Sequence, residues 1–411
     1  MPTGARSSVM RIVLAEGVTR FGDAITTVAL PLTAVLVLDA SPAGLALIGV
    51  AQAAPILLLS IPAGVWVDRR ARRWPILIAG DLGRALLLAL VPIAAILGIL
   101  SLPVLALIAF SVSVGGTLFD LAFAGWIPRL LARDELHRAN AQIELARSAS
   151  AVGGPAVGGA LVSAMSAPMA LLGDAATFVG SAILIGSVRR AEPSWPAPEA
   201  RGRMRDELGA GLRFIAGQPL VRAITATAGI NNFTRSIAMA VAVLYLVNAA
   251  DLSAAAIGIG FAVGNSGFVL GALVARGLSR RMGMGVTMQL GVGLFGPSML
   301  AFALAPVAWA GPAFTFMLFA HSFGIAINNV NQVTVRQILI PDRLRARVAA
   351  VTRLVIFGAL PAGTAVGGLI AEGLGLRAAF VASGVGLLVG SAPYLLVGVR
   401  KLRSIDQLQT A

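Results

Sequence analysis

The sequence predicts an all-α polytopic membrane protein whose twelve transmembrane helices form two parallel six-helix repeats. Of its 411 residues, 57% are apolar and 12% are charged, whereas about 25% of a soluble domain is charged. The mean hydropathy is +0.88, and the few charges fall between long apolar stretches. Short motifs of the first half recur in the second half. This composition excludes a soluble enzyme, a secreted disulfide-linked domain and a disordered chain.

Each predicted span contains the roughly 20 mostly apolar residues that a helix needs to cross a bilayer. The connections after even-numbered spans carry clusters of arginine, whereas the opposite set has almost no basic residue except Arg377. Because basic loops stay in the cytoplasm, we expect both termini to be cytoplasmic. The predicted spans are 12–38, 43–67, 75–98, 102–125, 140–163, 166–187, 220–248, 254–278, 284–305, 310–333, 348–372 and 376–399.

The segment 188–219 divides the chain into two bundles. It contains Pro193, Pro196 and Pro198, followed by a charged run at 201–207, so we expect a cytoplasmic linker with a short amphipathic helix near 205–216. The predicted domains are an N-terminal six-helix bundle, the linker, a C-terminal six-helix bundle and a cytoplasmic tail. Their bounds are 1–187, 188–219, 220–399 and 400–411.

Motifs in the two bundles recur at a nearly constant offset. Ala156-Val-Gly-Gly159 recurs as Ala365-Val-Gly-Gly368, an offset of 209 (365 − 156), and Asp39 recurs as Asp251, an offset of 212 (251 − 39). Two parallel six-span repeats with a site between them are a transporter architecture.

The rare residues exclude several kinds of chemistry. There is no cysteine, there are two histidines, and the one lysine, Lys401, has no glycine-rich loop before it. These counts argue against a metal site, a cofactor and a nucleotide-binding loop. The net charge of +14 is explained by membrane topology, so we expect no nucleic-acid partner.

Two motifs resemble signatures of the major facilitator superfamily. The segment from Gly64 through Asp68 to Arg73 closely resembles the loop between its second and third spans. Gly154-Pro155-Ala-Val-Gly158-Gly159 resembles the antiporter signature of its drug:proton exporters, and the run from Pro62 to Arg84 resembles the branch that holds macrolide and enterobactin exporters.

The resemblance implies a secondary transporter rather than an enzyme. It implies proton-coupled export of a small amphipathic molecule, such as a drug, an antibiotic or a siderophore-like metabolite, by a monomer in a bacterial cytoplasmic membrane. An uptake symporter uses the same fold and remains an alternative. A lipid flippase or a membrane sensor, which accumulates no soluble substrate, is a further alternative.

Three ionisable residues are predicted to couple transport to protons. Arg20 and Asp23 are three residues apart and therefore lie on nearly the same helix face. Arg235 occupies the position equivalent to Asp23 in the second repeat (235 − 23 = 212). Ionisable groups inside a bilayer are costly and usually functional, so we expect the Asp23 carboxylate to alternate between a proton and an arginine. The alternative is a permanent ion pair that fixes packing.

Charged residues at the cytoplasmic edge are predicted to form a gate. Ion pairs there would close this side in one state and separate in the other, a role that the resemblance implies for Asp68, Arg72 and Asp120. Ordinary positive-inside charge is the alternative, and we prefer it for Arg70 and Arg73. The gate residues are Gly64, Asp68, Arg69, Arg72, Asp120 and Arg147.

Polar residues of spans 7 and 10 are predicted to line a substrate cavity, because the resemblance implies that spans 1, 4, 7 and 10 enclose it. These residues are Asn231, Asn232, His321 and Asn328; the alternative is that they hold neighbouring helices together. Span 6 lies outside this set, so a structural hydrogen bond is expected for Asp174.

The glycine-proline run of span 5 is predicted to be a packing motif. Proline removes a backbone hydrogen bond, and small residues let two helices approach closely. The residues concerned are Gly154, Pro155, Gly158 and Gly159.

Overall fold

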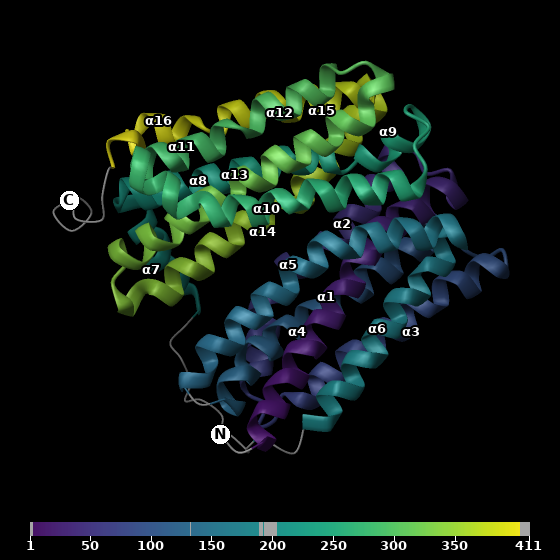
Figure 1. The fold of residues 1–411 in the computed structure, drawn as a ribbon, viewed down its shortest axis with the longest axis horizontal. Coiled ribbons are helices and arrows are strands. Elements are labelled where there is room, and N and C mark those ends of the chain that lie inside the picture. The colour runs from purple at the N-terminus through teal and green to yellow at the C-terminus, as the bar shows by residue number, and fades with distance from the viewer. Residues whose placement is uncertain (1–2, 132, 189–191, 193–203, 403–411) are drawn as a thin grey trace. The chain divides into compact units, whose positions relative to one another are not determined.

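The computed structural model describes residues 3–131, 133–188, 192 and 204–402, so most of the expected linker and the tail from 403 onward lie outside the described residues. Every regular element in this described part is a helix (Figure 1). Eleven helical segments within it are long and apolar enough to cross a membrane. They coincide with eleven of the twelve predicted spans and confirm an all-α membrane fold.

The predicted fifth span, 140–163, is the exception. It lies on α5 (Arg133–Ala164), a helix of 32 residues that is polar in its first half and rich in glycine and serine in its second. Its length, about 48 Å at 1.5 Å per residue, is sufficient to cross a bilayer. Its composition, rather than its length, sets it apart from the other eleven.

The chain forms two compact units, 1–199 with 252–262 and 200–251 with 263–411. In the first unit, α1 packs against α5 and α6, and α4 packs against α2 and α3. Ser41 caps the start of α2 and is followed by Pro42, a sequence typical of helix N-termini. The remaining bounds are α1 Thr3–Leu38, α2 Pro42–Asp68, α3 Trp74–Ile96, α4 Leu102–Leu130 and α6 Ala167–Val188.

The second unit contains the later helices, with the start of α10 assigned to the first unit. In it, α8 packs against α14 and α15, and α7 packs against α14. The bounds are α7 Met204–Gly217, α8 Pro219–Met239, α9 Ala242–Asn248, α10 Ala254–Met282, α11 Met284–Gly293, α12 Phe295–Leu304, η2 Val307–Trp309, α13 Ala310–Leu339, α14 Asp342–Leu374, α15 Leu376–Val389, α16 Ala392–Leu396 and η3 Val399–Lys401.

Three predicted spans of the second unit are each split into two helices, as α8 and α9, α11 and α12, and α15 and α16. Pro297 and Pro393 lie in the first turn of α12 and α16. A proline there cannot donate the backbone hydrogen bond that a continuous helix would need. Proline therefore explains two of the three breaks.

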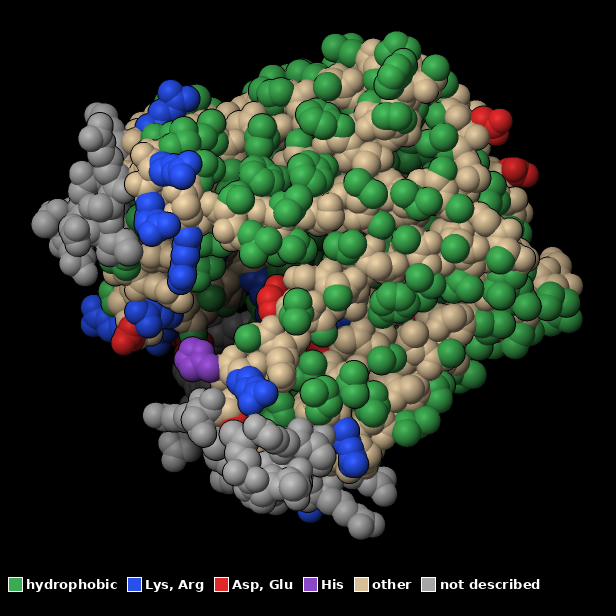
Figure 2. Space-filling model, in the orientation of Figure 1, with side chains coloured by type: hydrophobic (Ala, Val, Ile, Leu, Met, Phe, Trp, Pro, Cys, Tyr) green, Lys and Arg blue, Asp and Glu red, His purple; other side chains and the backbone are tan. Residues whose placement is uncertain are grey.

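Large hydrophobic side chains are exposed along the helices, as a membrane-embedded surface requires. Ile96 and Leu374 are each 77% exposed and Leu396 is 85% exposed. On the visible face of the second unit, hydrophobic side chains cover the helices and basic side chains gather at the end that holds α7 and α16 (Figure 2). A contiguous apolar surface of this kind marks contact with lipid.

Glycines of α5 let this helix lie directly on α1. A Cβ atom at Gly158 would be 3.0 Å from the Cα atom of Ile25, and one at Gly154 would be 3.0 Å from the carbonyl oxygen of Phe21. The same contacts recur between α14 and α8 in the second unit, with offsets of 209 (363 − 154) and 212 (233 − 21). The equivalent pairs are Gly154–Phe21 with Gly363–Phe233, and Gly158–Ile25 with Gly367–Ile237.

At a second pair of equivalent contacts, the small and the large residue stand on opposite helices in the two units. In the first unit, Gly22 of α1 faces Thr177 of α6, whereas in the second unit Thr234 of α8 faces Gly386 of α15. The offsets are again 212 (234 − 22) and 209 (386 − 177). These matching contacts confirm the internal repeat in three dimensions.

We expect Gly158→Ala to lower the thermal stability of the purified protein, because the added methyl group would press on the backbone of α1. Overpacking of this kind typically costs about 1–3 kcal/mol. Gly153→Ala is the matched control, since its methyl group would meet Phe21 at an ordinary 3.5 Å. Equal melting temperatures for the two variants, measured by fluorescence in detergent, would contradict this account of the packing.

Candidate transport site

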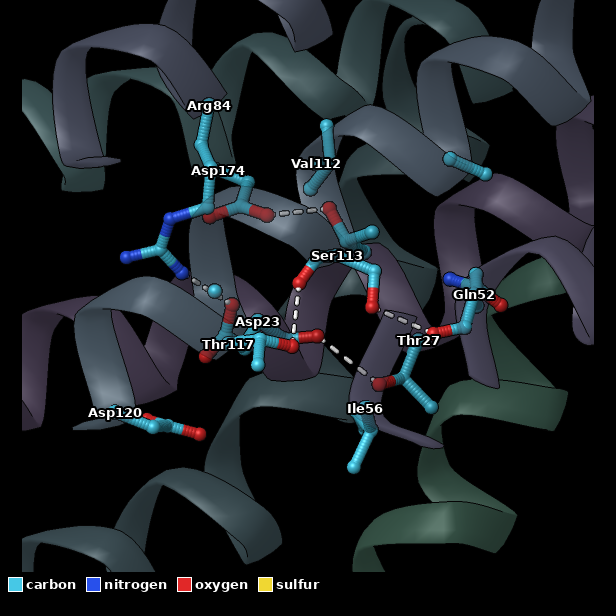
Figure 3. A pocket seen from close by; sticks show the side chains of 13 residues that line it. Asp23, Thr27, Gln52, Ile56, Arg84, Val112, Ser113, Thr117, Asp120 and Asp174 are labelled. Atoms are coloured by element: carbon cyan, nitrogen blue, oxygen red, sulfur yellow. Dashed lines mark hydrogen bonds and ion pairs between the residues drawn. The ribbon is translucent and has the colours of Figure 1, made fainter. Parts of the chain in front are cut away.

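The first unit contains a cavity of about 240 Å³ among α1, α2, α3, α4 and α6 (Figure 3). Its wall combines aliphatic side chains with several charged and polar groups. The polar lining includes Asp23, Thr26, Gln52, Arg84, Asp120 and Asp174.

Helical spacing places the charged groups of this site on common faces. Glu16, Arg20 and Asp23 are four and three residues apart on α1, and Asp81 and Arg84 are three apart on α3. Side chains at these spacings are neighbours on a helix surface. Each helix therefore presents its acids and bases as one patch.

Arg20 is in contact with three carboxylates. Its Nε atom donates to Glu16 at 2.8 Å, and one terminal nitrogen donates to Asp23 at 3.2 Å. The other terminal nitrogen donates to Asp120 of α4. Glu16 is fully buried and also accepts from Arg147 of α5 at 2.8 Å. This network joins α1 to α4 and α5.

Arg84 is the second buried cation of the site and only 2% exposed. It donates to Asp81 and also to Asp23, the latter at 3.3 Å. Its guanidinium lies 3.9 Å from the ring centre of Phe178 and 5.0 Å from that of Phe119. Contacts with two aromatic faces stabilise a cation in an apolar setting.

The site contains more acids than bases. Five carboxyl groups and three guanidinium groups belong to it, so full ionisation would leave a charge of −2 (3 − 5). Glu16, Asp81 and Asp174 are buried, whereas the Asp23 and Asp120 side chains are 35% and 44% exposed. Excess charge beside buried carboxyl groups is unfavourable, and binding a cation or a proton would relieve it. The carboxyl groups are those of Glu16, Asp23, Asp81, Asp120 and Asp174, and the guanidinium groups are those of Arg20, Arg84 and Arg147.

Asp174 lines this cavity, although span 6 was expected to lie outside the cavity-lining set. Its carboxylate accepts from the Thr26 hydroxyl and, at 3.1 Å, from the Thr177 hydroxyl. The expected hydrogen bonding is therefore present, but at the wall of the cavity. The packing of α6 against α1 places Asp174 at the cavity wall. A hydropathy profile does not indicate which helices pack together.

The predicted gate residues do not form one cluster. Asp68 pairs with Arg73 at 2.8 Å, and the Arg73 guanidinium fills the space that Gly125 of α4 leaves open. Arg69 and Arg72 are exposed, and Gly64 makes an ordinary 3.9 Å contact with Leu121. Asp120 and Arg147 belong instead to the ionic network of α1.

Glu192 holds the loop before α3 through hydrogen bonds, a role that no sequence motif indicated. Its carboxylate accepts from the backbone N–H groups of Arg73, at 2.8 Å, and Trp74, at 3.1 Å. Arg129 lies 3.6 Å away. Burial, together with the Arg129 guanidinium, lowers the pKa of Arg73 below its usual value, and the Asp68 carboxylate opposes this shift.

We expect Glu192→Ala to destabilise the protein, because the first backbone N–H groups of α3 would lose their acceptor. Loss of a helix cap costs about 1 kcal/mol. Glu192→Gln, which keeps one acceptor oxygen, should retain more of the stability. Thermal unfolding in detergent, with limited trypsin cleavage at the arginines of the loop, measures both effects. An unchanged melting temperature in Glu192→Ala would show that the cap contributes nothing.

In the second unit, Asn328 accepts from the Tyr394 hydroxyl at 3.1 Å, and this hydroxyl accepts from Gln332 at 3.0 Å. Asn232 donates to a backbone carbonyl of its own helix. The His321 ring lies 4.2 Å from that of Phe295, centre to centre. Asn328 of α13 is therefore hydrogen-bonded to Tyr394 of α16.

Arg235 and Asn231 lie one turn apart on α8. The Asn231 carbonyl oxygen is buried without a hydrogen-bond partner, and no carboxylate of the described residues acts on Arg235. Arg235 and Asp23 belong to different units, so their pairing stays a prediction.

The sequence profile of the transmembrane secretion effector family, a major facilitator family, matches residues 5–411. The chain belongs to this family. It is therefore a membrane transporter and not an enzyme, and the predicted superfamily is confirmed.

Two relatives of this transporter are exporters. The multidrug efflux pump Tap of Mycolicibacterium fortuitum is 27% identical over 425 residues, which cover 99% of each chain. The enterobactin exporter EntS of Escherichia coli O1:K1 / APEC is 30% identical over 364 residues, which cover 85% of this chain and 82% of the exporter.

Solved structures share the fold. A bacterial homologue of the iron transporter ferroportin, in an inward-facing state, has a TM-score of 0.76 at 16% identity and covers 96% of this chain and 98% of its own. The nucleoside transporter NupG has a TM-score of 0.73 at 11% identity, with coverage of 95% and 99%. At these identities the likeness shows the fold alone.

Proposed function

We propose that this transporter exports small amphipathic molecules in exchange for protons, by alternating access, from a bacterial cytoplasm. It acts as a monomer in the cytoplasmic membrane, with both termini in the cytoplasm. The relatives that pump drugs and enterobactin support export. The observation that carries the proton coupling is the surplus of carboxyl groups around the cavity of the first unit.

Proton uptake cancels the surplus negative charge, and proton release restores it. A carboxylate that is neutral in one state and ionised in the other links this charge to the conformation of the ionic network. The membrane potential contributes about 2.3 kcal/mol per charge for each 100 mV, so one or two protons drive accumulation without ATP.

The remaining predicted residues have separate roles in this proposal. The sequence-based assignment places the proton on Asp23, with Arg20 and Arg235 as its counterions. The edge residues Gly64, Asp68, Arg69, Arg72, Asp120 and Arg147 act in closing the cytoplasmic side. Asn231, Asn232, His321 and Asn328 contribute to substrate binding in the second unit.

The proposal is tested first by growth on a broad antimicrobial panel. An efflux-deficient bacterium would carry either the transporter gene or the empty vector, under the same growth and induction conditions. We expect protection against a subset of amphipathic compounds. Increased sensitivity would indicate uptake instead, and no difference on any compound would argue against drug export.

Proton coupling is then tested in everted membrane vesicles that have been acidified by respiration. A protective compound added to vesicles with the transporter should release protons, which a pH-sensitive dye reports, and vesicles with the empty vector should not respond. Movement of labelled lipid without a proton gradient would support a flippase. Movement of neither lipid nor compound would support a sensor.

A further inference from the structure

We infer that Asp174 of α6, rather than Asp23 of α1, is the carboxyl group that binds and releases the exchanged proton. This inference rests on the proposed function and names the residue that performs it. It follows from the different partners of the two carboxyl groups.

Both carboxylate oxygens of Asp23 are in contact with a cation. Oδ2 accepts from Arg20 at 3.2 Å, and Oδ1 accepts from Arg84 at 3.3 Å. Hydrogen bonds between ionised groups are about twice as strong as neutral ones. Protonation of Asp23 would weaken two of them at once and leave two guanidinium groups undercompensated. Asp23 is therefore suited to a fixed, ionised role.

Asp174 has hydroxyl partners instead. Its side chain is 1% exposed and accepts from Thr26. The Thr177 hydroxyl lies 3.1 Å from its carboxylate and 2.7 Å from its backbone carbonyl oxygen, which also accepts from it. A hydroxyl group is both a donor and an acceptor. The Thr26 hydroxyl therefore satisfies an ionised carboxylate by donating and a neutral carboxyl by accepting. The Thr177 oxygen, whose proton is directed mainly at the backbone carbonyl, remains an acceptor for the neutral carboxyl.

Space for this pocket is provided by a glycine. A Cβ atom at Gly22 would overlap both the Asp174 carboxylate and the Thr177 hydroxyl. At the equivalent position of the second repeat, 209 residues on (383 − 174), a fully buried serine stands in place of the aspartate. The fold therefore tolerates a neutral side chain here, and the carboxyl group is particular to the first unit.

The charged groups that act most strongly on Asp174 come from two of the helices packed against α6. Asp23 of α1 is the neighbouring acid, and Arg84 of α3 is the neighbouring base. Figure 3 shows Arg84 and Asp174 on the same side of the cavity, with Asp23 bonded to Arg84.

This geometry links the proton to the helices. When Asp174 releases its proton to the cavity, a new carboxylate competes with Asp23 and Asp81 for the Arg84 guanidinium. Movement of Arg84 toward Asp174 would weaken the α1–α3 ion pair with Asp23. Reprotonation of Asp174 would return Arg84 to its position in the structure.

Infrared spectroscopy of the purified protein tests the assignment without a known substrate. The C=O stretch of a protonated, buried carboxyl group should appear at acidic pH and vanish at alkaline pH in the wild type. We expect Asp174→Asn to lack this titrating band and Asp23→Asn to keep it. Persistence of the band in Asp174→Asn would overturn the assignment.

The vesicle assay completes the test with ethidium as the transported probe. Asp174→Asn should lose ethidium-induced proton release and should exchange ethidium at a rate that no longer depends on pH. Asp174→Glu should restore both, and Asp174→Ser serves if the asparagine variant does not fold. Proton release by Asp174→Asn and Asp174→Ser would overturn the assignment alone. Absence of proton release in the wild type, with ethidium and with every compound that protects in the growth test, would overturn the proposed function as well.

Discussion

Arg84→Met is expected to destabilise the folded transporter by about 3–5 kcal/mol, because removal of one partner from a buried ion pair leaves an uncompensated charge. Asp81 is fully buried and bonded to Arg84, which also contacts Asp23. The methionine would keep the apolar contact with the ring of Phe178 but supply no charge. The measurements are the melting temperature and the monodisperse fraction after extraction.

A double variant separates charge from packing in this prediction. Asp81→Leu combined with Arg84→Met removes both charges and should recover most of the lost stability, since apolar replacement of a buried pair is often neutral. Arg69→Met, at an exposed position, is the control for the substitution itself. If the double variant is no more stable than Arg84→Met, the ion pair is not the cause.

Arg20→Met is expected to leave the protein folded and to abolish transport near neutral pH. Glu16 keeps Arg147 and Asp23 keeps Arg84, but Asp120 loses the cation that joins it to α1. The site would then contain five carboxyl groups and two guanidinium groups, a charge of −3 (2 − 5) when ionised. Protons would replace the missing charge at lower pH, so activity should partly recover there.

Ethidium exchange in vesicles across a range of pH measures this dependence. Arg70→Met is the control for the substitution itself, because Arg70 is exposed and does not belong to the charged groups counted in the site. Its transport should remain closer to that of the wild type at neutral pH. A loss in Arg20→Met that is the same at every pH would contradict the electrostatic explanation.

Much of the fold was predictable because a membrane span and its orientation depend on nearby residues, namely the length of an apolar stretch and the charges of the adjoining loops. Apolar length located the spans, and the offsets of 209 and 212 predicted a repeat that the glycine contacts now confirm. The helix breaks were missed, since a window of apolar residues does not register Pro297 or Pro393 as an interruption. The weak fifth span shows the converse, because glycine and serine lower hydropathy without ending a helix.

The site was predictable only in part, because its contacts join helices far apart in sequence. The spacing of Arg20 and Asp23 on one helix gave their proximity directly. The pairing of Asp68 with Arg73 depends instead on the backbone of the loop, which Glu192 holds from a distance of more than a hundred residues. Helical spacing also accounts for the pairs Glu16–Arg20 and Asp81–Arg84. The contacts of Arg84 with Asp23 and of Arg147 with Glu16 depend instead on the packing of α1 against α3 and α5.

The exchange of sizes between Gly22–Thr177 and Thr234–Gly386 bears on how the chain assembles. The repeated contacts mean that each of these helices has a structural counterpart in the other unit. Pairing α1 with α15 would set glycine against glycine and leave a void, and pairing α8 with α6 would bring two threonines into collision. The complementary sizes therefore favour packing of α1 with α6 and of α8 with α15 over the exchanged pairings.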